Sequence, residues 1–245
     1  MAAVDDLLVV EAPLEISMGG VPLAVVMRTP GHDEDLARGF ALTEGIVLGP
    51  HELAAVTRIG GDDDDARWAI ALADGVSVDP LRFQRNLYAT SSCGVCGKAS
   101  IDAVRVSASR PQRVPMVATV LTSLPDRMRE SQDAFLSTGG LHAAAAFDVS
   151  GRLLASAEDV GRHNAVDKVV GTMSRSAWPL AGVALMVSGR VSFEIVQKAA
   201  VAGMGLIAGV SAPSSLAVEL GDELGMTIVG FLRGEAFNVY SGEIR

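Results

Sequence analysis

The first third of the chain has apolar-rich segments of strand length and one segment with helical spacing. Strands are predicted over residues 14–17 and 21–28, and the glycine pair between them is typical of a hairpin connection. Residues 33–46 combine helical spacing with acidic residues in the first turn, which favour a helix N-terminus. Residues 62–65 are four aspartates. They predict a solvated loop between two edge strands, because a calcium loop alternates its ligands with other residues.

From residue 117 onward, apolar runs of strand length alternate with segments of helical spacing. We predict helices over 123–136, 164–173, 193–201 and 214–224, and strands over 143–147, 153–156, 183–187, 206–210 and 226–231. This βαβα succession favours a sheet that is covered by helices and joined by parallel crossovers. The uncharged stretch 199–218 approaches the length of a membrane span, but its glycines, proline and serine pair predict a buried strand, a loop and a helix start.

The change of pattern near the middle of the chain predicts two domains in an α/β protein. Residues 1–110 would form a smaller β-rich domain that contains one helix and ends in a cysteine loop. Residues 111–245 would form a larger domain with a helix-covered mixed sheet. The segment 107–114 is the candidate linker between them.

Composition narrows the classes of partner. The chain has 245 residues, 49% of them hydrophobic and 4% aromatic, and a mean hydropathy of +0.34, which indicates a well-packed chain. Its 20 Lys and Arg against 29 Asp and Glu give a net charge of −9, which argues against a protein that coats nucleic acid or an anionic membrane. The first residues lack a signal-peptide pattern, so we expect a cytoplasmic protein. An anionic ligand therefore needs a local site.

The two cysteines, Cys93 and Cys96, lie in a glycine-punctuated CxxC loop. Two cysteines cannot build a disulfide framework for a chain of this size. A structural zinc would need two further ligands from the four histidines, so we expect no metal site unless two chains share one. A thiol–disulfide redox pair and a sulfur relay through a persulfide remain open, and the residues alone favour them equally.

Polar residues are densest at 158–168, where a predicted strand runs into a helix. His163 suits a general acid or base, a donor to an anion, or a cap residue. Its neighbours, which include Arg162 and Asp159, favour a functional role, because such loops commonly carry binding and catalysis.

Three more transitions after strands favour anion binding. Ser188 and Arg190 follow one strand, Ser214 follows the next, and the segment 232–237 follows the last. In an open α/β sheet these positions meet at the carboxyl ends of the strands, which predicts one nucleotide-like pocket with residues 138–142 as a further wall. Taken singly, each serine is equally explained as a helix N-cap.

Together these motifs resemble the FdhD family of formate dehydrogenase accessory sulfurtransferases. The resemblance extends over almost the whole chain and rests on residues 28–36, 43–46, 93–98, 138–142, 158–164, 188–190 and 237–240. It implies a sulfurtransferase that takes sulfur from a cysteine desulfurase, carries it as a cysteine persulfide, and delivers it to bis-molybdopterin guanine dinucleotide, the molybdenum cofactor, before insertion into formate dehydrogenase. It also implies a homodimer and a cytidine deaminase-like fold for the larger domain, with no nucleic acid or membrane partner.

On this interpretation Cys93 receives the sulfur and Cys96 assists or resolves the persulfide. The residues expected to bind the cofactor are Arg162, His163, Ser188, Arg190, Ser214, Leu232, Arg233, Gly234, Glu235, Ala236 and Phe237. Deaminase chemistry is not expected, because no Pro precedes the CxxC and no His-x-Glu follows it.

Two alternatives remain. A thiol oxidoreductase would cycle both cysteines through a disulfide and would need no desulfurase. A cofactor-binding chaperone would use the loops alone and would function without either thiol.

Overall fold

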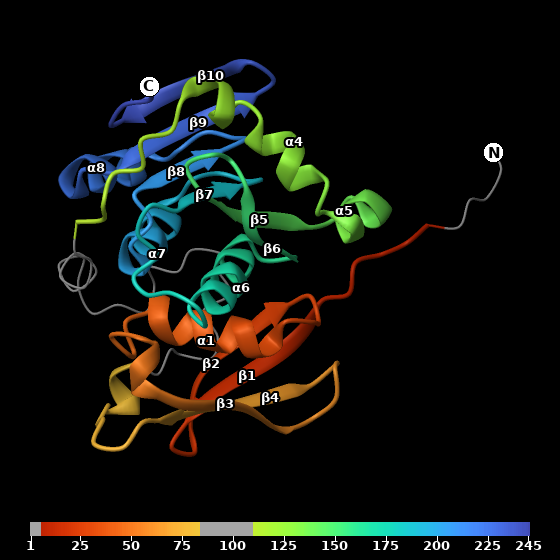
Figure 1. Ribbon diagram of the computed structural model, residues 1–245. Helices are drawn as coiled ribbons and strands as arrows, with labels where there is room; N and C mark the ends of the chain where they lie inside the picture. The colour runs from red at the N-terminus through yellow and green to blue at the C-terminus, as the bar shows by residue number, and fades with distance from the viewer. Residues whose placement is uncertain (1–5, 84–109) are drawn as a thin grey trace.

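The structure is a computed structural model that describes residues 6–83 and 110–245. Two sheets, with helices between them, form a mixed α/β fold as predicted (Figure 1). The first part of the chain contains β1 (Ala12–Met18), β2 (Val21–Arg28), α1 (Asp33–Thr43), η1 (Pro50–Glu52), β3 (Leu53–Gly60), β4 (Ala66–Leu72) and η2 (Pro80–Arg82). The second contains α3 (Ala118–Leu121), α4 (Leu124–Arg129), α5 (Asp133–Thr138), β5 (His142–Phe147), β6 (Leu153–Asp159), α6 (Arg162–Met173), β7 (Ala184–Val187), α7 (Phe193–Ala202), β8 (Leu206–Gly209), α8 (Ser215–Leu224), β9 (Thr227–Arg233) and β10 (Ala236–Ser241).

The smaller sheet has the strand order β2-β1-β4-β3. The predicted β1–β2 hairpin is confirmed. It turns through Gly19 and Gly20 at φ values of 59° and 80°, which glycine adopts without a steric penalty. Residues 62–65 do connect β3 and β4, but β4 lies inside the sheet and is parallel to β1. The expectation that both flanking strands are edge strands was therefore wrong for β4.

The larger sheet has the order β10-β9-β8-β7-β5-β6. β7, β8 and β9 are parallel and are joined through α7 and α8, while β5, β6 and β10 pair antiparallel with their neighbours. The predicted mixed sheet and its parallel crossovers are confirmed. Strands of this kind are buried on both faces, which explains their continuous apolar runs.

Two predicted elements differ from the structure. The helix expected over 123–136 is divided between α4 and α5, with α3 before them. Pro125 lies in the first turn of α4, and Gln132, at φ −105° and ψ 57°, leaves the helical region before α5 begins. Segment 232–237 does not simply leave the last strand: β9 continues to Arg233, and β10 follows a two-residue turn. Most residues of β10 are exposed, so the hydrophobic signal for this edge strand is weak.

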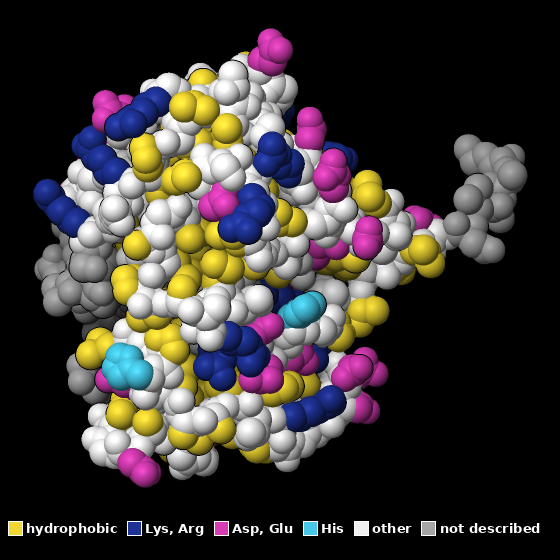
Figure 2. All heavy atoms as spheres, in the orientation of Figure 1, with side chains coloured by type: hydrophobic (Ala, Val, Ile, Leu, Met, Phe, Trp, Pro, Cys, Tyr) yellow, Lys and Arg dark blue, Asp and Glu magenta, His cyan; other side chains and the backbone are white. Residues whose placement is uncertain are grey.

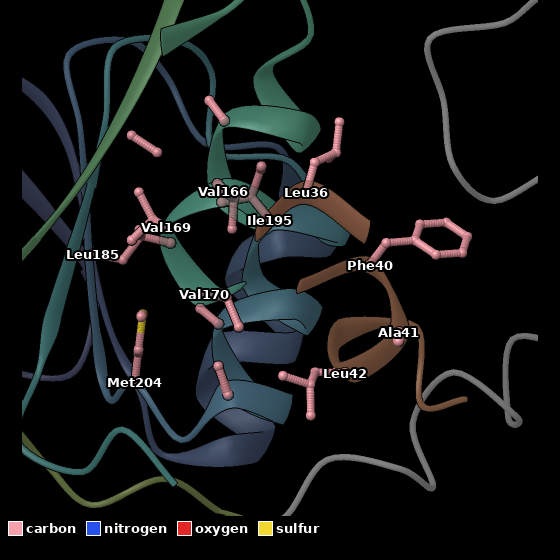
Figure 3. Packing of buried hydrophobic residues seen from close by; sticks show 14 of the residues in the cluster. Leu36, Phe40, Ala41, Leu42, Val166, Val169, Val170, Leu185, Ile195 and Met204 are labelled. Carbon is pink, nitrogen blue, oxygen red and sulfur yellow. The ribbon is translucent and has the colours of Figure 1, made fainter. Parts of the chain in front are cut away.

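Helix α1 lies between the two sheets and crosses α6 at very short distance (Figure 1). A Cβ on Gly39 of α1 would lie 1.8 Å from the backbone oxygen of Asp167, and one on Gly171 of α6 would lie 1.9 Å from that of Asp35. Glycine is therefore required at both positions. Figure 3 shows Leu36 of α1 and side chains of α6 within one hydrophobic cluster, which also includes residues of both sheets.

A second cluster covers the opposite face of the larger sheet. Its members from residues 114–128 include Val114, Leu121 and Leu124, and they pack against β5, β7, β8 and β9. The proposed linker falls partly outside the described residues. The division after residue 110 and the cytidine deaminase-like fold remain predictions.

The uncharged stretch 199–218 forms the end of α7, β8 and the start of α8, as predicted. Among the described residues, no helix combines the length and the apolar character needed to cross a membrane.

Candidate functional site

Several strand ends meet at one edge of the larger sheet and form a pocket of about 640 Å³, called here the strand-end pocket. The parallel strands β7, β8 and β9 contribute Ser188, Val210 and Arg233 just at or after their carboxyl ends. β5 runs antiparallel to β7, so it contributes its first residue, His142, to the same edge. The structure thus brings together residues that are far apart in the sequence, where α/β sheets commonly bind ligands.

Three of the predicted ligand-binding residues line this pocket: Ser188, Leu232 and Arg233. The Ser188 hydroxyl oxygen accepts a hydrogen bond of 2.9 Å from the backbone N–H of Ala143, which fixes the side chain at the pocket wall. Arg233 Nε donates to the carbonyl oxygen of Val210 at 3.1 Å and so orients its guanidinium group. Leu232 is buried and contributes apolar surface.

The remaining residues of segment 232–237 continue away from the pocket. Gly234 and Glu235 form the turn, and Ala236 and Phe237 begin β10. They are not among the described residues that line the pocket. Their contact with a ligand remains a prediction.

The further wall predicted at residues 138–142 is present, since Gly139, Gly140, Leu141 and His142 line the pocket. Burial, followed by the nearby charge of Arg162, lowers the pKa of His142, against the opposing effect of Asp159. His142 is therefore neutral at neutral pH and can offer one ring nitrogen as a donor and the other as an acceptor.

Arg162 and Arg190 lie beside the pocket rather than among its lining residues. Both are close enough to His142 to lower its pKa. On the face drawn in Figure 2, basic side chains of the described residues lie among acidic and apolar ones. Among the described residues that line the pocket, Arg129 and Arg233 carry positive charge and Asp126 carries negative charge.

His163 is directed to a different place. Its Nε2 lies 3.4 Å from Ser192 Oγ and 3.8 Å from Glu194 Oε2, at the start of α7. Burial, then the charges of Lys198 and Arg162, lower its pKa to about 4. His163 is not among the described residues that line the pocket. The sequence predicted one pocket that contains both His163 and Ser188, whereas the structure places these two residues at different sites.

Ser214 is also separate from the described pocket lining. It is the N-cap of α8, and its hydroxyl oxygen accepts a hydrogen bond of 3.3 Å from the backbone N–H of Ala217. The alternative explanation for this serine, a helix cap, accounts for its position.

Much of the polar segment 158–168 joins the two parts of the chain. Asp159 and Lys168 are buried and form an ion pair of 2.7 Å. Asp159 also accepts from the backbone N–H of Thr29 at 3.2 Å, and Lys168 donates to the carbonyl oxygen of Thr29 at 2.9 Å. Asn164 donates to the carbonyl oxygen of Met27 at 2.7 Å. These three residues therefore fix the end of β2 against α6.

A second buried network links α1, α6 and α7. Lys198 Nζ lies 2.8 Å from an Asp167 carboxylate oxygen, 2.9 Å from Thr43 Oγ1 and 3.0 Å from Glu44 Oε1. Burial opposes the charged form of Lys198, but Asp167 and Glu44 outweigh it and hold its pKa above its ordinary value. The contact region of α1, α6 and α7, with both lysine networks, is called the helix junction below.

The sequence alone does not reveal the Lys198 network. Its members are scattered over residues 43–198, and Lys198 has the usual appearance of a polar residue in an amphipathic helix. Cys93 and Cys96 lie outside the described residues. Among the residues that are described, no group of three or more His, Cys, Asp or Glu side chains is arranged to hold a metal ion.

Comparison with known proteins gives consistent matches over nearly the full chain. The chain is 50% identical to the sulfur carrier protein FdhD of Streptomyces coelicolor over 98% of this chain and 89% of that protein. It is 49% identical to the sulfur carrier protein FdhD of Mycobacterium tuberculosis over 96% and 90%, respectively. A crystal structure from Desulfotalea psychrophila, provisionally described as a formate dehydrogenase accessory protein, shares the fold with a TM-score of 0.76 at 22% identity, covering 98% of this chain and 90% of that one.

A family model adds the last piece of evidence. The model described as the FdhD/NarQ family matches residues 9–245, which include both sheets, the segment with the two cysteines and the strand-end pocket. The protein belongs to the FdhD/NarQ family.

Proposed function

We propose that this protein is a sulfur carrier that acts in the maturation of formate dehydrogenase. The observation that carries the proposal is its similarity of about 50% identity, over almost the whole chain, to proteins named sulfur carrier protein FdhD. A sulfur carrier needs an accessible thiol, and the chain has just two, Cys93 and Cys96.

The sulfur step is an exchange between thiolates. The Cys93 thiolate attacks the outer sulfur of a donor persulfide, the donor S–S bond breaks, and the donor leaves as a thiolate while Cys93 becomes the persulfide. No external oxidant or reductant enters this step. Attack by Cys96 on the Cys93 sulfur would then release hydrosulfide and leave a Cys93–Cys96 disulfide, which a cellular dithiol returns to two thiols. The donor in this proposal is a cysteine desulfurase.

The strand-end pocket supports binding of the sulfur acceptor, a molybdenum cofactor with guanine nucleotide groups. Arg233 supplies positive charge, Ser188 a hydroxyl group and neutral His142 a hydrogen-bonding ring, in a volume of about 640 Å³ that suits a nucleotide-sized group. Arg162 and Arg190 beside the pocket add to its attraction for phosphate. The recipient of the loaded cofactor in this proposal is formate dehydrogenase. Assembly as a homodimer remains an expectation.

Mass spectrometry tests the carrier step. After incubation with a cysteine desulfurase and cysteine, the intact wild-type protein should gain the mass of one sulfur atom. Cys93→Ala should lose this gain, and Cys96→Ala should retain it. An unchanged wild-type mass would exclude the carrier role and favour the oxidoreductase. If Cys93→Ala/Cys96→Ala still supports formate dehydrogenase activity in cells, the chaperone alternative is correct.

Guanosine diphosphate is a suitable probe for the pocket. Calorimetry should show that wild type binds it and that Arg233→Ala binds it about tenfold more weakly, because a charge-assisted hydrogen bond is lost. Arg152→Ala is the matched control, since Arg152 is exposed and paired with Asp148 in the β5–β6 turn. Equal loss in both variants would indicate general electrostatics instead of a pocket.

A further inference from the structure

Helix α5 contributes Phe135 to the lining of the strand-end pocket, and the residues that flank the helix contribute Gln132 and Gly139, although little burial holds the helix in place. None of its six residues is buried, and its N-cap residue, Gln132, makes no capping hydrogen bond through its side chain. Figure 1 shows α5 projecting beyond β5 and β6. It nevertheless carries Phe135, which lines the pocket, and the Arg129 guanidinium carbon lies 5.9 Å from the centre of the Phe135 ring.

A carboxylate from another element holds the N-terminus of this helix. Glu158 of β6 accepts a hydrogen bond of 2.7 Å from the backbone N–H of Phe135 through Oε1, and one of 3.0 Å from that of Ala134 through Oε2. A carboxylate at this position satisfies two amides that have no partner within the helix and complements the helix dipole. The bidentate contact therefore fixes both the position and the direction of α5.

Glu158 and Asp159 are adjacent in β6 but serve opposite faces of the strand. Asp159 contacts Lys168 and Thr29 at the helix junction, whereas Glu158 contacts α5. Successive side chains of a strand point to opposite faces, so this short segment supports both regions. The functional role that the sequence indicates for segment 158–168 thus has a structural basis that does not require Glu158 to contact a ligand.

We propose that Glu158 is a positioning residue for ligand binding: it fixes α5, and through α5 it sets the place of Phe135 and Arg129 in the strand-end pocket. The inference rests on the proposed function of that pocket. Glu158 itself is not among the described residues that line the pocket, so its effect on the ligand is indirect.

Glu158→Gln tests this role with little change in size. The amide retains one oxygen acceptor but directs an N–H group at the second backbone N–H, so α5 loses part of its anchor. We expect hydrogen exchange in residues 133–138 to become faster and the affinity for guanosine diphosphate to fall about 5- to 30-fold, while the thermal midpoint changes little because α5 is exposed.

Glu130→Gln is the matched control. Glu130 is an exposed carboxylate between α4 and α5, and in the described part of the chain its side chain makes no hydrogen bond to α5. This variant should match wild type in both exchange and affinity. If Glu130→Gln weakens binding as much as Glu158→Gln, loss of a carboxylate near the pocket explains the effect, and the positioning role is wrong.

A double-mutant cycle separates positioning from direct contact. If Glu158 acts through the α5 wall, Glu158→Gln should weaken binding much less in a Phe135→Ala background than in wild type. Fully additive effects, or unchanged affinity in Glu158→Gln despite faster exchange, would overturn the inference alone. Failure of wild type to bind guanosine diphosphate would instead overturn the proposed pocket function, and with it the role of Glu158.

Discussion

The helix junction and the strand-end pocket contain similar residue types but use them differently. In the junction, Lys168 and Lys198 are buried, and each donates to several fixed oxygen atoms. In the pocket, Arg233 has one backbone partner for Nε, and Arg129 is exposed beside an aromatic ring. The contacts therefore distinguish side chains that stabilise the fold from side chains that remain directed at an open volume.

This comparison predicts two classes of variant. Changes in the junction should lower the free energy of unfolding and leave ligand affinity intact. Changes in the pocket should lower affinity with little effect on unfolding. A junction variant that loses ligand affinity but not stability, or a pocket variant that loses stability but not affinity, would contradict this assignment for that residue.

The largest effect is expected for Lys198→Met. Removal of the ammonium group leaves Asp167 buried without its charge partner, and the expected loss is about 3–5 kcal/mol in the free energy of unfolding. Urea denaturation measures this loss, and calorimetry with guanosine diphosphate should give wild-type affinity for the folded variant. The double variant Lys198→Met/Asp167→Leu should be less destabilised than the single one, because no uncompensated carboxylate of Asp167 remains.

The next largest effect concerns the close crossing of α1 and α6. Gly39→Ala places a methyl group against the backbone oxygen of Asp167 and forces the helices apart, with an expected loss of about 2–3 kcal/mol. Gly60→Ala is the control, since the nearest atom to its added Cβ is Arg67 Cδ at 3.9 Å. Equal unfolding free energies for the two variants would show that α1 and α6 can move apart without loss of stability.

The buried His163 should make the free energy of unfolding depend on pH. Its folded-state pKa of about 4 lies below the usual value of 6.5, so the unfolded chain binds the proton first as the pH falls. The stabilisation is fully present above pH 6.5 and is lost progressively as the pH falls towards 4. Between pH 7 and 5 the folded state should lose about 2 kcal/mol of its free energy of unfolding.

His163→Gln should therefore show a smaller loss of stability than wild type between pH 7 and 5. Urea denaturation at both pH values gives the difference. His51→Gln, which changes an exposed histidine, should behave like wild type. A wild-type pH response in His163→Gln would show that the burial of His163 is not the cause.

Most elements of the fold are predictable because their signals are local. The glycine pair before β2 and the apolar runs of β7, β8 and β9 specify their structure over a few residues. The prediction of one helix over 123–136 was wrong, because helical spacing does not show that the backbone leaves the helical region at Gln132 and that a second helix begins after it. β10 was missed because an exposed edge strand has little hydrophobic pattern.

The candidate site is predictable to a smaller extent. The structure brings Ser188, Arg233 and His142 together in one pocket, because the order of parallel strands places such positions at one edge of the sheet, and their contact with a ligand remains a prediction. Sequence could not separate Arg162 from His163, since the direction of each side chain at the start of α6 depends on packing against α7. The Lys198 network depends on three helices that meet only in the folded chain.

The smallest effect is expected for two serines, Ser214 and Ser188, that both follow predicted strands and were both expected to bind the ligand. Ser214→Ala removes the cap of α8 and should lower the free energy of unfolding by about 1 kcal/mol without changing the affinity for guanosine diphosphate. Ser188→Ala removes a hydroxyl group from the pocket wall and should weaken that affinity several-fold. Weaker binding in Ser214→Ala would extend the ligand site to the start of α8, because a residue that acts only as a helix cap cannot produce it.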